Sequence, residues 1–128
     1  MPSPSLIRRR ILIALPGFSL LTLAGCAVIP GISDIDTLLQ EGEQLYREKR
    51  YDEAIARFKA VIVRDPLNWR AWLWLCRTYI VRLMWGDAID AGRQAFKLSP
   101  QGTEVLPTFL QALFGGGLQA LNLSLIHI

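Results

Sequence analysis

Apolar residues recur at helical spacing through most of this chain. Leu38, Leu39, Leu45 and Tyr46, for example, form one apolar stripe between polar neighbours. A period near 3.6 residues predicts amphipathic α-helices. We expect five helices, over residues 34–48, 52–64, 68–83, 88–98 and 103–114. The predicted fold class is therefore all-α.

Prolines and glycines separate the predicted helices. Asp65-Pro66 and Ser99-Pro100 should end the second and fourth helices, because proline disfavours a helical residue before itself. Gly86-Asp87 should form a turn, and Gly115-Gly116-Gly117 should stop the fifth helix in a flexible turn. Ser33 is the expected cap of the first helix.

A fixed offset relates the first pair of helices to the second. Ala54-Ile55 and Pro66 recur as Ala88-Ile89 and Pro100, each displaced by 34 positions. A period of this length is typical of a solenoid, in which copies of one supersecondary unit are stacked. The pattern favours a binding scaffold over an enzyme.

The repeated unit resembles the tetratricopeptide repeat, in which small and bulky residues alternate at set places. The first copy matches this pattern at Gly42, Tyr51, Ala54, Phe58 and Pro66, and the second at Trp72, Leu75, Cys76, Tyr79, Ala88, Ala95 and Pro100. Cys76 occupies the small position that Gly42 fills in the first copy. The resemblance implies a helical-hairpin solenoid of about two and a half repeats, over residues 34–66, 67–100 and 101–122.

Two positions depart from the family's pattern. Glu41 occupies a place that is usually apolar, and Gly92 replaces the bulky residue of the second copy. We expect Trp85 to supply part of the volume missing at Gly92.

The N-terminal segment has the three parts of a secretory leader. Arg8, Arg9 and Arg10 precede an apolar run, Ile11 to Ala24, of 14 residues. A membrane-crossing helix needs about 20 residues, so a cleaved signal peptide over residues 1–25 is favoured over an uncleaved span from Ile11 to Val28.

The tetrapeptide Leu23-Ala24-Gly25-Cys26 resembles the lipobox of bacterial lipoproteins. That resemblance implies diacylglycerol and N-acyl groups on Cys26, with residues 26–33 as the lipidated cysteine and a linker. The alternative is an ordinary signal-peptidase site beside a chance cysteine. Ala27, in place of an inner-membrane retention aspartate, implies anchoring in the bacterial envelope at the outer membrane, facing the periplasm.

Charge gives no indication of nucleic-acid binding. The net charge is +3, but without the three leader arginines the 14 basic residues become 11, equal to the 11 acidic residues. The mature chain is therefore neutral, and no basic patch is expected.

Candidate binding residues follow from the tetratricopeptide resemblance, in which the first helices of successive hairpins line a concave groove for a protein or peptide. The corresponding residues are Gln40, Glu43, Arg47, Arg70, Trp74 and Arg77. Trp74 is the candidate anchor, because it lies apart from the predicted core stripe. Alternatively it packs under a neighbouring repeat that is missing from this chain.

The sequence offers no catalytic, metal or cofactor site. Cys76 is interpreted as a small core residue, and His127 is the single histidine. A metal site or a nucleophilic triad needs partners that this histidine lacks.

The final hexapeptide, residues 123–128, is unusually apolar for the end of a solenoid. It is similar to one translated frame of a transposon end used as a sequencing-library adapter. We expect these residues to be foreign to a longer protein.

The functional hypothesis is a membrane-tethered scaffold in envelope assembly, secretion or pilus biogenesis. One alternative is the N-terminal docking part of a larger envelope enzyme. Another is a structural subunit that packs on its partner through Trp72, Trp74 and Trp85.

Overall fold

The computed structural model describes residues 33–126, which form five α-helices and no strand. The helices are α2 (Ile35–Arg47), α3 (Tyr51–Arg64), α4 (Trp69–Val81), α5 (Trp85–Leu98) and α6 (Val105–Ile126). The prediction of an all-α fold is confirmed. The predicted signal peptide and Cys26 lie outside the described residues.

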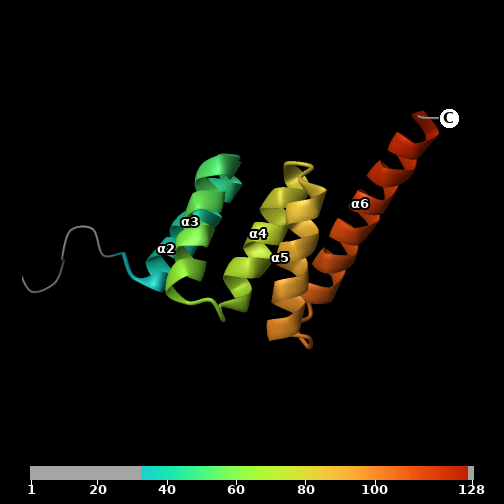
Figure 1. The fold of residues 1–128 in the computed structure, drawn as a ribbon. Helices are drawn as coiled ribbons and strands as arrows, with labels where there is room; N and C mark the ends of the chain where they lie inside the picture. The colour runs from blue at the N-terminus through green and yellow to red at the C-terminus, as the bar shows by residue number, and fades with distance from the viewer. Residues whose placement is uncertain (1–32, 127–128) are drawn as a thin grey trace, which may run out of the picture. The chain divides into compact units, whose positions relative to one another are not determined.

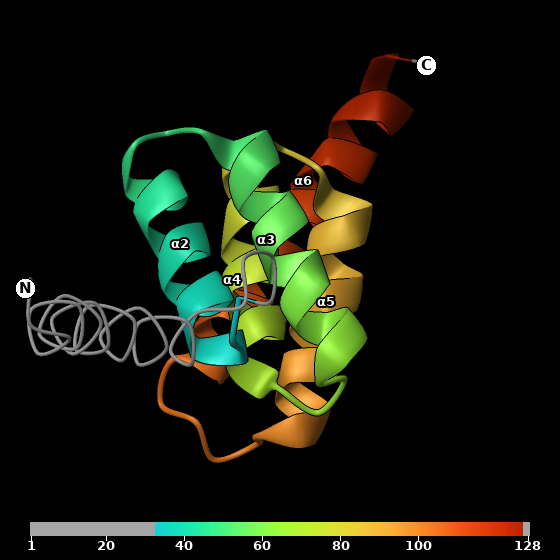
Figure 2. The same ribbon diagram turned by 90° about the vertical axis from the view of Figure 1, so that its left-hand side faces the viewer.

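The helices follow one another in space in chain order (Figure 1). The α2–α3 hairpin forms one end of the row, as the turned view shows (Figure 2). Helix α3 packs against α4, α4 against α5, and α6 against both α5 and α4. The fold is therefore repeat-like, with each hairpin in contact with the next.

The 34-residue offset holds for the helix ends as well as for the sequence. Both ends of α4 lie 34 positions after those of α2, and both ends of α5 lie 34 positions after those of α3. Local capping explains part of this regularity. The Asn68 side chain accepts a hydrogen bond from the Ala71 amide at 3.2 Å, and Asp34, rather than the predicted Ser33, caps α2 through the Asp36 amide at 2.7 Å.

Close contacts between small and large residues hold each hairpin together. Gly42 of α2 lies against the Phe58 ring of α3, where a side chain at position 42 would collide with the ring. Phe58 and Ala54 are fully buried. In the second hairpin a Cβ at Gly92 would lie 3.1 Å from the Cys76 sulfur, so α4 and α5 approach closely at the corresponding place.

The expectation for the space beside Gly92 was wrong. Phe109 of α6 fills it, since a Cβ at Gly92 would lie 2.7 Å from the Phe109 ring. Trp85 lies instead against Gly115 of α6. The ring of the following helix is therefore the nearest neighbour of this space, and the Cys76 sulfur of the same hairpin is the next.

The predicted stop after Phe114 was also wrong, because α6 continues through the three glycines to Ile126. The Trp85 ring covers Gly115, and the Ile89 side chain lies against Gly116. These two glycines let α5 approach α6, so they serve helix packing rather than a turn. The predicted turn at Gly86-Asp87 likewise belongs to the first turn of α5.

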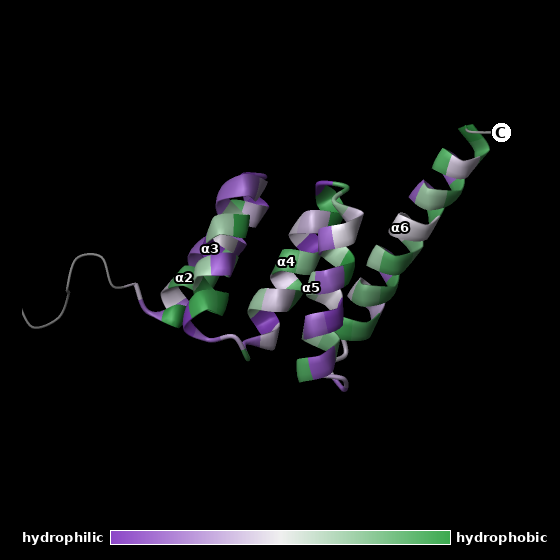
Figure 3. Ribbon diagram, viewed as in Figure 1, coloured by the Kyte–Doolittle hydropathy of each residue, from purple (hydrophilic) through white to green (hydrophobic). Residues whose placement is uncertain are grey.

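Helix α6 differs in composition from the other described helices. It is mostly hydrophobic along its length (Figure 3). By length and composition alone, this helix of 22 residues could cross a membrane. Its C-terminal part extends past the ends of the other helices (Figures 1 and 2). Most of its large apolar side chains are exposed, in its N-terminal half as well as in this part.

Candidate partner-binding surface

The six predicted groove residues lie on two helices, α2 and α4. Gln40, Glu43 and Arg47 belong to α2, and Arg70, Trp74 and Arg77 belong to α4. Within each helix they are three, four or seven positions apart, which places them on one face. Contacts between α2 and α4 bring part of this set together.

Glu43 connects the two helices at the centre of this surface. Its carboxylate lies 3.5 Å from the Arg47 guanidinium in the same helix and 3.6 Å from the Arg70 guanidinium of α4. Both arginine side chains are exposed, whereas that of Glu43 is largely covered. Glu43 therefore holds two cations at the surface, one from each hairpin.

Arg77 is held by two partners. Its Nη2 lies 2.6 Å from Oε2 of Glu104, just before α6, and its guanidinium carbon lies 5.0 Å from the Trp74 ring centroid. A cation above an indole face is attracted by the ring's quadrupole. The carboxylate and the indole together fix the direction of the Arg77 guanidinium.

Trp74 belongs partly to the core, contrary to its expected separation from the core stripe. Its ring stacks on Phe58 with centroids 5.9 Å apart and an interplanar angle of 10°. Tyr46 meets it edge-on at 5.3 Å. The indole is half-buried and packs on the first hairpin, so it links the two hairpins and presents only part of its surface outward.

Four of the predicted groove residues line one small cavity. Its volume is about 150 Å³, and it is lined by Glu43, Trp69, Arg70, Leu73, Trp74, Arg77 and Glu104. Gln40 does not line this cavity, and neither does Arg47. The cavity therefore combines an aromatic and aliphatic wall with two arginines and two carboxylates.

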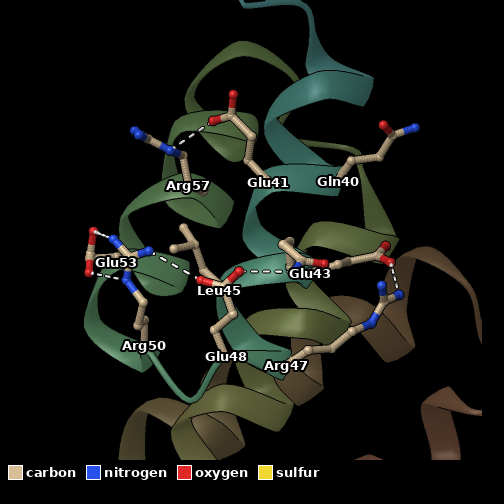
Figure 4. A pocket seen from close by; sticks show the side chains of 10 residues that line it. Gln40, Glu41, Glu43, Leu45, Arg47, Glu48, Arg50, Glu53 and Arg57 are labelled. Atoms are coloured by element: carbon tan, nitrogen blue, oxygen red, sulfur yellow. Dashed lines mark hydrogen bonds and ion pairs between the residues drawn. The ribbon is translucent and has the colours of Figure 1, made fainter.

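The remaining predicted residues line a larger and more polar cavity of about 710 Å³ (Figure 4). Its lining residues are Gln40, Glu41, Glu43, Gln44, Leu45, Arg47, Glu48, Arg50, Glu53 and Arg57. They come from α2, from α3 and from the turn between them, so this cavity lies within the first hairpin.

Paired charges dominate the larger cavity. Arg57 Nε lies 2.9 Å from Glu41 Oε2, and Arg50 donates to both Glu53 oxygens at 2.8 and 2.6 Å. The Arg50 hydrogen bonds lower the pKa of Glu53, and the Gln44 amide, followed by Arg50, lowers the pKa of Glu48. Glu41 at its usually apolar position is thus matched by a cation.

Sequence reasoning missed Trp69, Leu73 and Glu104 as members of the small cavity. Glu104 lies 34 positions after Arg70, so extending the same period into the third unit identifies it. The repeat period thus gives a usable signal for Glu104, whereas neither Trp69 nor Leu73 follows a predicted groove residue by one period.

The other chemistry-bearing residues are placed inside the core or apart from one another. Cys76 is fully buried, and this burial raises the pKa of its thiol to about 11. Within residues 33–126, no group of three or more His, Cys, Asp or Glu side chains is arranged to hold a metal ion. No buried side-chain nitrogen or oxygen of this range lacks a hydrogen-bond partner.

A scan of protein-family models found no match to the chain, and a search of curated proteins found none either.

Proposed function

We propose that this chain is a tetratricopeptide-type scaffold that binds a protein partner and has no catalytic activity of its own. The observation that supports this proposal is the 34-residue recurrence of two whole hairpins, including both ends of every helix. Stacked hairpins of this kind expose an extended face of first helices. Here that face contains the small cavity beside Trp74.

The proposed ligand is a peptide segment with an acidic side chain. Arg70 and Arg77 are paired with Glu43 and Glu104, and the carboxylate of Glu104 is exposed whereas that of Glu43 is largely covered. A pair that stays in contact with water contributes only about 0–1 kcal/mol. A ligand carboxylate can therefore replace Glu104 at small cost and bind the fork of the Arg77 guanidinium, and the exposed Arg70 guanidinium can bind a carboxylate without releasing Glu43. The apolar wall formed by Leu73 and Trp74 adds contact area for a neighbouring side chain.

The proposal includes a membrane tether at the N-terminus. We propose that residues 1–25 are a lipoprotein signal peptide and that Cys26 takes diacylglycerol and an N-acyl chain. Two or more acyl chains give stable anchoring, whereas one chain alone is marginal. The proposed location is the periplasmic face of the outer membrane.

Metabolic labelling tests the tether. The wild-type chain should incorporate a labelled fatty acid, and Cys26→Ser should not. Incorporation that persists in Cys26→Ser would refute lipidation at this residue.

Photo-cross-linking tests the binding surface. A photoreactive amino acid at position 70, within the small cavity, should capture a discrete protein when the chain is expressed in its own bacterium. Arg93 is the matched control, because it is also an exposed, ion-paired arginine but lies on α5. Equal capture from positions 70 and 93 would exclude this face as the binding surface.

A further inference from the structure

A groove lies between α3 and α5, two helices that do not contact each other. Residues of these helices form its walls, and Trp72, Leu75 and Tyr79 of α4 form its floor. Its volume is about 400 Å³, and ligand pockets typically have volumes of about 300–1,000 Å³. We call it the α3–α5 groove. Both hairpins that form it are complete within the described residues.

The α3–α5 groove and the candidate partner-binding surface lie on opposite sides of α4. Successive residues of an α-helix are rotated by about 100° about its axis. Trp72 follows Arg70, and Tyr79 follows Arg77, by two positions, which corresponds to a rotation of about 200°. The groove shares no lining residue with the small cavity beside Trp74. A ligand in one of these sites therefore leaves the other open.

Side-chain size keeps the groove open. Ile62 of α3 and Leu75 of α4 line it, and the residues 34 positions later are Phe96 and Phe109. Those two rings stack between α5 and α6, with centroids 6.0 Å apart and an interplanar angle of 28°. The first junction has two aliphatic side chains in place of two rings, so space remains between its helices.

The floor of the groove is apolar and held in place. The Trp72 Nε1 donates a hydrogen bond to the Pro66 carbonyl oxygen at 2.9 Å, which fixes the ring. Because the indole N–H is satisfied there, the ring offers apolar surface to a ligand. Leu75 and Tyr79 are buried beneath the groove. Such a preformed apolar floor is typical of sites that bind an apolar group.

Two carboxylates lie on the α5 wall. Asp87 and Asp90 are three positions apart, which places them on one face of the helix. Asp90 is paired with Arg93 at 3.2 Å, whereas Asp87 forms no ion pair within residues 33–126. The α3 wall contributes one cation, Lys59, which within this range pairs with neither carboxylate. Negative charge therefore predominates in the lining.

This combination of charge and apolar surface selects the ligand. A lysine or arginine of the ligand can pair with Asp87 while a neighbouring apolar side chain enters the space beside Ile62. Anionic groups such as lipid phosphates would instead face Asp87 and Asp90, and the juxtaposition of like charges is unfavourable.

We propose that the α3–α5 groove is a second protein-binding site, for a peptide segment that combines a large apolar side chain with a lysine or arginine. The proposal is independent of the binding function proposed for α2 and α4, because it concerns the other side of α4. The two sites select ligands of opposite charge, so one chain can hold two different partners.

Selection from a phage-displayed library of random peptides tests this site. The bait is the full-length Cys26→Ser chain, which lacks the predicted lipid. Clones that also bind its Ile62→Phe derivative are removed, because the larger ring should fill the groove as Phe96 fills the corresponding place. The remaining peptides should combine an apolar residue with a lysine or arginine.

Charge reversal in the bait then tests the role of Asp87. Asp87→Lys should raise the dissociation constant of a selected peptide by about tenfold or more. Asp36→Lys is the matched control, because Asp36 is also an exposed carboxylate in the first turn of its helix, α2, and it should leave the constant unchanged. Arg77→Glu should also leave it unchanged, which separates this site from the surface of α2 and α4. Circular dichroism should show the same helix content for all variants.

Photo-cross-linking identifies the occupant directly. Val63 lines the groove and is 82% exposed, so a photoreactive amino acid at this position is accessible to a ligand. In a mixture of the chain, a selected peptide and phosphatidylglycerol vesicles, the adduct should contain the peptide.

Three results would overturn the proposal. One is a selection that enriches no peptide, or only peptides without a lysine or arginine. Another is equal affinity of a selected peptide for the Asp87→Lys and Asp36→Lys variants. The third is a cross-link from position 63 that joins two copies of the chain, or the chain and lipid, in place of the peptide.

Discussion

Lys49 and Leu83 lie 34 positions apart and share one backbone conformation, with φ of 63° and 59°. The bonds around them are the same. Arg50 and Met84 donate to the carbonyls of Leu45 and Tyr79, both at 2.9 Å, which closes each first helix in a Schellman motif. The two hairpins are therefore repeated down to the conformation of their turns.

The left-handed conformation at Leu83 predicts a stabilising substitution. Glycine adopts positive φ without the steric cost that a leucine side chain brings, and Leu83 is 65% exposed, so little burial is lost. Leu83→Gly should raise the free energy of unfolding by about 1 kcal/mol in urea denaturation. Gln94→Gly, on the exposed side of α5, should lower it by about the same amount. A loss of stability in Leu83→Gly would contradict the conformation assigned to this turn.

Replacing Gly115 or Gly117 of α6 with alanine should change the free energy of unfolding in opposite directions. Gly115→Ala should lower the free energy of unfolding by about 1–3 kcal/mol, because its methyl group would collide with the Trp85 ring. Gly117→Ala should raise it by up to about 1 kcal/mol, because position 117 is open and alanine favours a helix.

The Gly117→Ala substitution also distinguishes a continuous helix from a turn at position 117. Gly117 lies 34 positions after Leu83, where the first two units place a residue with positive φ. If the chain turned there, Gly117→Ala would be destabilising. The sign of its effect in thermal denaturation therefore decides between the two conformations.

Cys76 should be unreactive in the folded protein. Burial raises the pKa of its thiol to about 11, above its ordinary value of about 8.5. In the Cys26→Ser background, Ellman's reagent at pH 8 should therefore react only at the rate of unfolding. Rapid reaction in the absence of denaturant would show that the thiol is accessible.

The Cys76 thiol also makes the free energy of unfolding depend on pH in the alkaline range. The unfolded chain ionises at Cys76 before the folded chain does, so the contribution of the neutral thiol is complete below about pH 8.5 and declines as pH rises toward 11. The difference in free energy of unfolding between the Cys26→Ser chain and its Cys76→Ala derivative should follow this course. A constant difference from pH 8 to 11 would contradict it.

The helices and their period could be predicted from sequence because they depend on local patterns. Asn68 at a helix start and Pro66 after a helix end act on their immediate neighbours, so their effects are visible in the chain itself. The helical conformation at Gly115 could not be predicted in this way, because it depends on contact with Trp85, which lies 30 positions earlier. Glycine alone indicates a turn or a close contact, and only the neighbour in space distinguishes them.

Trp74 shows the same limit at the candidate binding surface. Its spacing within α4 suggested a position outside the core, but Phe58 and Tyr46 of the first hairpin cover part of its ring. Glu104, by contrast, could have been found, since it follows Arg70 by one period. Periodicity therefore placed the candidate surface on α2 and α4, while contacts between hairpins determined how much of it is exposed.

Binding of the captured partner to charge-reversed variants tests the central claim, that the face of α2 and α4 holds a protein ligand. With the segment identified by cross-linking as the titrant, Arg77→Glu should raise the dissociation constant by about tenfold or more, since it removes a cation from the small cavity and adds a like charge beside Glu104. Arg93→Glu, on α5, should leave the constant unchanged. Equal affinity of the two variants for this segment would contradict the account.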